Sequence, residues 1–208
     1  LTVGGYRVSP AGELIWGENN RGVPVCSSNS VQDQICLLED GDGGCFFLWG
    51  DQRNGDAGDI YALRILNNGR KDARWRENGN PIVVEAGSQI NARCCIDGEN
   101  GMIVLWIDDR IGGDFNIWAQ RLAPSGELLW GDGAGIPVCN QEDQQRQPKI
   151  CTDGEGGAFL TWRDDRNMDE TNWDIYVQRI DADGNLMWSE ADGGIPLCTA
   201  EGEQKKPI

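Results

Sequence analysis

The fold is decided by the segment Gly156-Gly157-Ala158-Phe159-Leu160-Thr161-Trp162-Arg163-Asp164-Asp165-Arg166, which reads G-G-x-x-x-x-W-x-D-x-R. The pattern occurs three times in the 208-residue chain: a second copy runs from Gly43-Gly44 to Arg53, and a third, which begins with Asn100-Gly101, ends at Arg110. The steps from Arg53 to Arg110 and from Arg110 to Arg166 are 57 and 56 residues. A regular period of this size predicts a repeat architecture.

Each repeat divides into four segments, which we number in chain order. In the third repeat they are residues 145–150 before an Asp-Gly turn, the W-x-D-x-R segment, residues 174–179, and Trp188 with the following residues 195–198. The second and third segments alternate with period 2, which is typical of β-strands. Four short antiparallel strands joined by glycine turns predict one propeller blade. We therefore expect an all-β, β-propeller-type array of four-stranded antiparallel blades.

The repeat boundaries predict one array over residues 1–208, with three complete blades and partial blades at both ends. The boundaries fall at 1–31 (partial), 32–88, 89–144, 145–203 and 204–208 (partial). The chain starts in a third segment, because Val3–Arg7 aligns with Ile175–Arg179. Joining the two ends leaves the outer unit without its second segment. We therefore expect a fragment of a longer array; the alternative is a closure that omits one strand.

Composition excludes several classes of partner and site. The formal net charge of −16 disfavours nucleic acid and anionic membrane surfaces. No apolar run approaches the ~20 residues that span a bilayer, so we expect no membrane insertion. The chain has no histidine, which removes histidine triads and makes a zinc site improbable. Its 34 acidic residues leave a glycosidase carboxylate pair open, but nothing singles out two of them.

Tryptophan recurs once on the second segment and once on the fourth. Large rings at repeated positions are expected to fill the wedge between neighbouring blades. Trp118 and Trp173 lie off these positions and are the candidates for an exposed platform that stacks on sugar rings. The repeated positions are Trp49, Trp106 and Trp162, and Trp16, Trp75, Trp130 and Trp188.

In W-x-D-x-R the three side chains share one face of a strand, since alternate residues point the same way. Buried Asp and Arg need partners. We expect an ion-pair ladder that joins the second segment to the third or one blade to the next, with the third-segment arginines (7, 64, 121 and 179) supplying some pairing. The alternative is a ring that binds an acidic or sugar ligand, but repetition in every blade favours structure. The residues are Trp49, Asp51, Arg53, Trp106, Asp108, Arg110, Trp162, Asp164 and Arg166.

Asp181-x-Asp183-Gly184 resembles the start of a calcium loop, but no glutamate follows at EF-hand spacing. The equivalent turns at Gly12, Gly69 and Gly126 lack this acidic pair and read as ordinary hairpin turns. We therefore expect no cofactor, with calcium at Asp181 and Asp183 as the alternative. The repeated Asp-Gly turns that begin at Asp40, Asp97 and Asp153 are likewise expected to be turn chemistry.

The eight cysteines form no C-x-x-C pair. Cys26, Cys139 and Cys198 share one repeat position, where the repeat at 32–88 has Val83, so we expect them to pack as small apolar residues. For Cys45, a bond to Cys94 or to Cys36 is the more plausible pairing.

The repeat also resembles known sequences. Its succession of Asp-Gly-x-Gly-Gly, Trp-x-Asp-x-Arg, Asp-Ile-Tyr-x-Gln-Arg and Gly-x-x-x-Trp is similar to the repeats of large secreted bacterial β-propeller proteins, over essentially the whole chain. That resemblance implies a propeller and an extracellular or cell-surface setting. The Asp-Gly-x-Gly…Trp part also resembles the Asp-box of sialidase-type propellers, although none of the sialidase catalytic pattern maps onto this chain.

Three functions follow as hypotheses. The first is a non-enzymatic extracellular scaffold or recognition module that binds protein or glycan through loops at one end of the blades, within a longer polypeptide or a self-assembly through open strand edges. The second is a glycoside hydrolase or lyase with its site in the central channel. The third is a calcium-dependent adhesive segment. An enzyme should show a once-only polar cluster, and the insert at residues 167–173 is the longest departure from the repeat.

Overall fold

A computed structural model describes residues 3–17, 22–55, 58–188, 193–200, 202 and 204. Its strands form three four-stranded antiparallel sheets and one two-stranded sheet. The described helical structure is a single 3₁₀ turn, η1 (Gly131–Gly133). The predicted all-β, propeller-type array of blades is therefore confirmed.

Each four-stranded sheet is one blade, and its strands pair in chain order. The two-stranded sheet, which we call blade 0, is the partial blade at the N-terminal side. Blade 0 holds β1 (Val3–Gly5) and β2 (Val23–Cys26); blade 1 holds β3 (Gln32–Glu39), β4 (Cys45–Asp51), β5 (Asp59–Ile65) and β6 (Asn80–Val83); blade 2 holds β7 (Gln89–Ile96), β8 (Met102–Asp108), β9 (Asn116–Leu122) and β10 (Ile136–Cys139); blade 3 holds β11 (Gln145–Thr152), β12 (Ala158–Asp164), β13 (Asp174–Ile180) and β14 (Ile195–Cys198).

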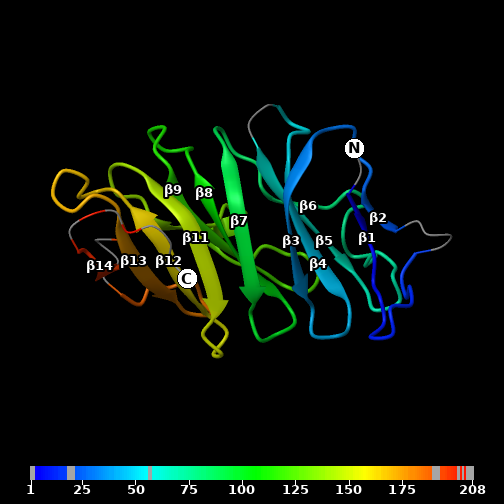
Figure 1. The fold of residues 1–208 in the computed structure, drawn as a ribbon. Coiled ribbons are helices and arrows are strands. Elements are labelled where there is room, and N and C mark those ends of the chain that lie inside the picture. The colour runs from blue at the N-terminus through cyan, green and yellow to red at the C-terminus, as the bar shows by residue number, and fades with distance from the viewer. Residues whose placement is uncertain are drawn as a thin grey trace.

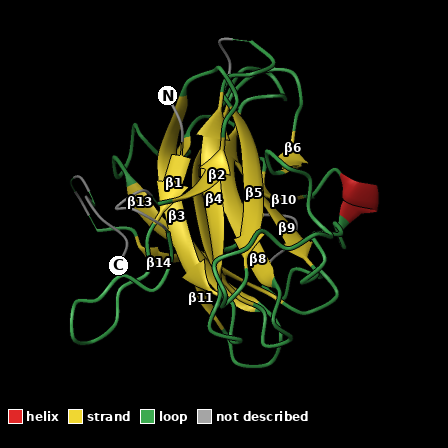
Figure 2. Ribbon diagram, turned by 90° about the vertical axis from the view of Figure 1, so that its right-hand side faces the viewer, coloured by secondary structure: helices red, strands yellow, loops and turns green. Residues whose placement is uncertain are grey.

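The blades stand side by side in chain order, from blue at one end of Figure 1 to orange at the other. Their first strands, β3, β7 and β11, are neighbours across the blade boundaries. In the view turned by 90°, the sheets lie behind one another and the 3₁₀ turn lies at the periphery (Figure 2). The loops between strands therefore gather at the two ends of the blades.

Each first strand carries a bulge at the same place. Its pairing with the second strand shifts register after the second residue, and the third residue has a positive φ: 51° at Gln34, 57° at Asn91 and 55° at Gln147. An extra residue in the left-handed region bends a strand and increases its twist. Asparagine and other polar residues tolerate this conformation better than β-branched ones. The bulge therefore belongs to the repeat.

The core lies between the blades and is built on the repeated tryptophans. Trp49, Trp106 and Trp162 are 0% exposed on the second strands, and Trp16, Trp75 and Trp130 are buried on the fourth segments. The prediction that these six rings pack inside the protein is confirmed. Trp188 is half-buried and stacks on Phe159 with ring centroids 5.8 Å apart.

One contact repeats across every boundary between blades. The fourth-segment tryptophan donates its indole N–H to a carbonyl in the third-to-fourth-segment turn of the next blade. The bonds run from Trp16 to Asn67 (2.9 Å), from Trp75 to Pro124 (3.1 Å) and from Trp130 to Ala182 (3.2 Å). The contacts between blades therefore repeat with the period of the sequence, because each ring binds the equivalent turn of the following repeat.

The turn glycine makes this contact possible. A Cβ on Gly69, Gly126 or Gly184 would lie 2.9–3.0 Å from the ring of Trp16, Trp75 or Trp130 respectively. All three glycines also have a positive φ of 79–90°. Gly12 has the same conformation in blade 0, where no described atom lies within 4 Å of a Cβ.

The expected fourth repeat opening at 204–208 lies outside the described residues except for Gln204, whose backbone N–H donates to the Trp173 carbonyl at 2.9 Å. Among the residues that the structure describes, no helix is long and apolar enough to cross a membrane.

Candidate functional site

The W-x-D-x-R residues form a compact unit within each blade, which we call the Trp–Asp–Arg latch. In blade 1, the carboxylate of Asp51 accepts the indole N–H of Trp49 at 2.9 Å and a guanidinium N–H of Arg53 at 2.5 Å. The Arg53 guanidinium lies 3.9 Å above the ring of Tyr61 on β5. The latches of blades 2 and 3 repeat this arrangement at Asp108 and Asp164.

In blade 1 the latch holds the Asp51 carboxylate ionised inside the protein. Asp51 is fully buried, and burial opposes its ionisation. Hydrogen bonds from Arg53, Trp49 and Ser30 outweigh that effect and hold the pKa of the Asp51 carboxyl below its ordinary value. The carboxylate of each latch aspartate accepts hydrogen bonds from an indole and a guanidinium group. The latch therefore stabilises the loop end of the second strand and leaves no free acid for chemistry.

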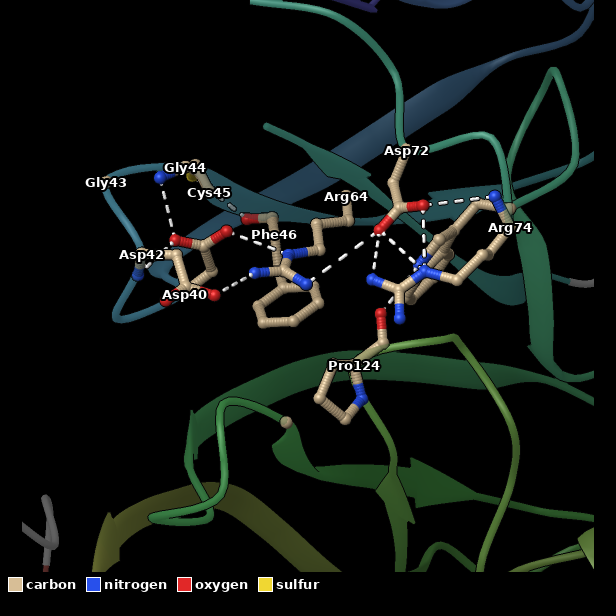
Figure 3. Close-up of polar contacts among 12 residues, drawn as sticks. Asp40, Asp42, Gly43, Gly44, Cys45, Phe46, Arg64, Asp72, Arg74 and Pro124 are labelled. Atoms are coloured by element: carbon tan, nitrogen blue, oxygen red, sulfur yellow. Dashed lines mark hydrogen bonds and ion pairs between the residues drawn. The ribbon is translucent and has the colours of Figure 1, made fainter. Parts of the chain in front are cut away.

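The third-segment arginines form a second set of ion pairs. In blade 1, Arg64 donates to Asp40 and to Asp42 of the Asp-Gly turn, each at 2.8 Å, and lies 3.8 Å from Asp72 (Figure 3). Arg121 and Arg179 bind the equivalent turns. The expectation that these arginines pair with the latch aspartates is wrong, because a turn carboxylate lies directly opposite them within the same blade.

The Asp-Gly turns themselves are capped by their aspartates. Asp40 Oδ1 accepts the backbone N–H groups of Asp42 and Gly44 at 2.9 and 2.7 Å, as Figure 3 shows. Asp97 and Asp153 make the same pair of bonds. These three carboxylates close the turn with one oxygen and hold an arginine with the other.

The predicted aromatic platforms differ from expectation. Trp118 is only 8% exposed, because it occupies the position of Tyr61 and Tyr176 and lies under the Arg110 guanidinium at 4.1 Å. The expectation that Trp118 is exposed is wrong for this reason. Trp173 is half-buried, with the Arg163 guanidinium 4.4 Å above its ring.

The acidic pair at Asp181 and Asp183 lies in a closed hairpin turn. Asp181 Oδ1 accepts the backbone N–H groups of Asp183 and Asn185 at 3.0 and 2.8 Å, and its other oxygen accepts the Asn185 side chain. Across the described residues, no three or more Asp, Glu, Cys or His side chains are grouped so as to hold a metal ion.

A polar hollow of about 340 Å³ lies at the loop between β12 and β13. It is the place where the third repeat departs from the other two. The loop contributes a half-buried asparagine and three exposed residues, and the loop before β11 contributes Asp143. The lining residues are Asp143, Arg166, Asn167, Met168, Asp169 and Glu170.

The floor of this hollow is held by Asn167. Its side-chain amide donates to Asp174 at 3.2 Å and to the Tyr176 hydroxyl at 3.3 Å, and Thr171 also donates to Asp174 at 2.9 Å. The second oxygen of Asp174 is buried without a hydrogen-bond partner among the described residues. The loop is thus anchored at its base while its tip, residues 168–170, is exposed.

Blade 1 holds a related cluster at the equivalent loop. There Asn54 donates to Asp59 at 2.7 Å and to the Tyr61 hydroxyl at 2.9 Å. Burial raises the pKa of the Asp59 carboxyl. Asn167 lies in the insert at residues 167–173 that the sequence pointed to, but the contacts of Asn54 and Asn167 with an Asp and a Tyr were not predicted. The sequence contains a signal for these two asparagines. Repeats 1 and 3 share Arg-Asn (53–54 and 166–167) and Asp-Ile-Tyr (59–61 and 174–176), whereas repeat 2 has Arg-Ile (110–111) and Asn-Ile-Trp (116–118).

The surroundings of the hollow are acidic. Burial raises the pKa of the Asp165 carboxyl, and the negative charges of Asp143 and Asp164 act in the same direction. Asp165 also accepts the backbone N–H of Gln144. A site with this lining repels anions and offers carboxylate and amide groups to hydroxyl groups.

An apolar hollow of about 300 Å³ lies on the outer face of blade 3. Phe159 and Leu197 are 37% and 66% exposed there, and Lys149, Cys151 and Thr161 contribute polar atoms. This face corresponds to the faces of blades 1 and 2 that the next blade covers.

The described cysteines are free thiols. Cys26 and Cys139 are buried, which agrees with the packing interpretation, whereas Cys198 is half-buried. Cys36 and Cys94 are the pair whose sulfurs meet, at 3.5 Å. The expected pairing of Cys45 with either of them is therefore wrong, because Cys45 directs its thiol to the Phe46 carbonyl at 3.2 Å.

Comparison with known proteins identifies the fold alone. No protein-family model matches the sequence, and no curated protein matches it either. The structure is similar to that of a "putative glycoside hydrolase" from Bacteroides ovatus, with a TM-score of 0.50 and 10% identity over 93% of this chain and 57% of that one. An endo-arabinase from Bacteroides thetaiotaomicron is similar with a TM-score of 0.45 and 17% identity over 81% of this chain and 62% of that one. This chain thus spans about three fifths of the length of those structures. The likeness to the first of them agrees with the β-propeller-type fold.

Proposed function

We propose that the protein is a non-enzymatic, extracellular recognition module that binds a neutral, hydroxyl-rich ligand, a glycan, at the hollow between β12 and β13. The single observation that carries the proposal is the position of this hollow. It lies on the longest insert in the repeat, at the loop end of a blade, and its lining is polar. A loop that occurs once on a repeated scaffold is not needed for the packing of every blade, so it is the best candidate for a binding function.

The chemistry of the lining favours a glycan. Asp143, Asp169 and Glu170 offer carboxylate oxygens that accept sugar hydroxyl groups, and Asn167 adds an amide. The acidic lining and the net charge of −16 disfavour phosphorylated or sulfated ligands. The extracellular setting rests on the resemblance to repeats of secreted bacterial propellers.

The non-enzymatic assignment rests on what the acids already do. The latch and turn aspartates are engaged by arginine, indole and backbone N–H groups, and the same arrangement recurs in every complete blade. Catalytic groups are built once and need a pKa matched to their task.

Binding is tested with a glycan array, followed by calorimetry on the best ligand. The double variant Asp169→Asn/Glu170→Gln should weaken binding at least about tenfold, a loss of roughly 1.4 kcal/mol. Each change replaces one accepting carboxylate oxygen by a donating NH₂ group. Asp183→Asn, an exposed acid outside the hollow, is the matched control and should leave affinity unchanged. Equal affinity in the double variant would place the ligand elsewhere.

A glycoside hydrolase is the second candidate, and one observation favours it. The structure shares its fold with a "putative glycoside hydrolase", and burial raises the pKa of Asp165 beside the hollow, as a general acid requires. Release of reducing ends from a panel of neutral polysaccharides, abolished by Asp165→Asn, would replace the binding proposal with this one. A calcium-dependent adhesive role is tested separately, by adding calcium: an unchanged melting temperature removes it.

A further inference from the structure

Two cysteines of neighbouring blades meet across a blade boundary. Cys36 lies on β3 of blade 1 and Cys94 on β7 of blade 2, and their sulfur atoms are 3.5 Å apart. Both side chains are half-buried. One further side-chain contact joins the same two strands, from the Asn91 backbone N–H to Gln34 Oε1 at 2.6 Å. The two thiols thus face each other at the junction of two first strands.

The environment makes one member of the pair nucleophilic. A hydrogen bond from Cys94 lowers the pKa of the Cys36 thiol to about 6, against the opposing effect of burial and with help from the charge of Arg93. The same interaction raises the pKa of Cys94. Burial raises the pKa of Cys45 to about 11, and those of Cys95 and Cys139 to about 12. The reactive form of a cysteine is the thiolate, and these three thiols remain protonated at neutral pH.

We propose that Cys36 and Cys94 are a redox site at which thiol–disulfide exchange with a small-molecule disulfide forms a covalent bond between blades 1 and 2. The sulfurs must approach by about 1.5 Å to reach the length of a disulfide bond. Rotation about the Cα–Cβ bond sets the position of each sulfur. Closure therefore needs this side-chain rotation and a small shift of the two strands.

The exchange proceeds in two balanced steps. The Cys36 thiolate attacks one sulfur of the disulfide R–S–S–R, its S–S bond breaks, and R–S⁻ leaves with the electron pair. Cys94 then loses its proton to that R–S⁻ and attacks the Cys36 sulfur, so that the second R–S⁻ leaves and takes up a proton from water. The two protein thiols are oxidised by two electrons, and the small disulfide is reduced to two thiols.

The bond would close a loop that contains most of blade 1, from β3 through to β7. A cross-link across such a long loop restricts the unfolded chain strongly and stabilises the folded one. The pair therefore reports the redox state of the surroundings through the stability of one blade boundary.

The test uses the whole chain, oxidised glutathione as the disulfide, and intact mass spectrometry. In the reduced wild-type protein the Cys36–Cys94 pair should lose two hydrogens, and no glutathione should remain on either of these two cysteines. Peptide mapping after thiol alkylation should recover one peptide pair that joins the β3 and β7 segments. The oxidised protein should melt at least about 3 °C higher than the reduced one.

Two variants separate the roles of the sulfurs. Cys94→Ser should retain one glutathione on Cys36, because the second thiol that would displace it is gone. Cys36→Ser should remain unmodified at Cys94. Cys45→Ser is the matched control and should form the Cys36–Cys94 bond like the wild type. Circular dichroism establishes that each variant is folded, and Cys36→Ala and Cys94→Ala replace any serine variant that is not.

Three results would overturn the proposal. They are a wild-type protein in which no Cys36–Cys94 bond forms, a cross-linked peptide pair that contains Cys45 or Cys151 in place of Cys36 or Cys94, and a folded Cys94→Ser variant that carries no glutathione on Cys36. The exposed Cys151 provides an internal reference, since its modification without a Cys36–Cys94 bond would show that the reagent was active.

Discussion

At the residue scale, stability depends on rings that meet glycines. The indole of Trp106 is 0% exposed, donates to Asp108, and lies where a Cβ on Gly135 would come within 2.8 Å. Trp49 and Trp162 have the same partners at Gly79 and Gly194. The ring is therefore enclosed by a glycine of its own blade as well as by the neighbouring blades.

Trp106→Ala should destabilise the protein by roughly 3–5 kcal/mol, because it removes a buried ring and leaves a cavity. It also leaves the Asp108 carboxylate without its indole donor, although Arg110 remains. Urea unfolding followed by fluorescence measures the loss. A value under about 1 kcal/mol would mean that the site collapses around the missing ring or that the ring is not packed in solution.

Two equivalent turn glycines separate backbone strain from ring contact. Gly12 and Gly126 both have a φ of +83°, but a Cβ meets nothing within 4 Å at Gly12, whereas at Gly126 it comes within 2.5 Å of Asn80 Nδ2 and 2.9 Å of the Trp75 ring. Gly12→Ala should cost about 1 kcal/mol from the left-handed backbone alone. Gly126→Ala should cost at least about 2 kcal/mol more, because the ring or the turn must move. Equal costs in thermal unfolding would mean that the turn moves away freely.

At the element scale, the loop ends of the blades are held by buried charges of two kinds. The latch carboxylates have arginine and indole partners, and hydrogen bonds depress the pKa of Asp51 despite its burial. Asp165, beside the hollow, has no arginine among the causes that shift it, and burial raises its pKa. The first kind stabilises the fold at neutral pH, whereas the second destabilises it.

The pH dependence of stability should show both signs. A depressed pKa, as in Asp51, contributes stability that is present above the unfolded value near 3.8 and is lost as pH falls through the lower folded value. The raised pKa of Asp165 acts in the opposite direction, since stability increases as pH falls through that folded value.

Asp165→Asn should therefore be more stable than the wild type at pH 7, and the difference should vanish below about pH 3.8, where the wild-type carboxyl is protonated in both states. The amide oxygen can still accept the Gln144 N–H, so the change is confined to charge. Unfolding free energies from pH 7 to pH 3 measure it. A destabilised variant at pH 7 would show that the charge strengthens the Gln144 bond more than burial weakens the carboxylate.

At the scale of the whole molecule, the blades are joined by one contact used repeatedly. Trp16, Trp75 and Trp130 each reach the turn of the following blade, and each is buried there. Trp188 holds the equivalent position in blade 3, but no such turn covers it among the residues that the structure describes. The apolar hollow near Phe159 and Leu197 marks the same uncovered face.

Trp130→Ala and Trp188→Ala form a matched pair for this contact. Trp130→Ala should cost at least about 3 kcal/mol, since it removes a buried ring and its hydrogen bond to Ala182. Trp188→Ala should cost about 1 kcal/mol or less, because its ring is half-buried and stacks only on Phe159 in the described region. Equal losses in the free energy of unfolding would mean that an additional contact covers Trp188 in solution.

The repeat alone predicted the strand order within each blade and the rings that fill the core. These features depend on residues close in sequence: alternation within a strand, a glycine in a turn, and a tryptophan at a repeated place. The Asn–Asp–Tyr cluster under the hollow was equally local, but it occurs in two repeats of three and was not recognised. Trp118 was mistaken for an exposed ring because its repeat equivalents, Tyr61 and Tyr176, are not tryptophans.

The tertiary structure decided what depends on residues that are one repeat apart or opposite each other in a sheet. It assigned the third-segment arginines to the Asp-Gly turns, brought the sulfur of Cys36 to that of Cys94, and formed the hollow beside Asn167. A repeat period specifies which positions are equivalent, but it does not specify which strands lie opposite or how far one blade is rotated against the next. Strand pairing and loop packing within blade 3 form the hollow, whereas packing across the boundary between blades 1 and 2 brings the two thiols together.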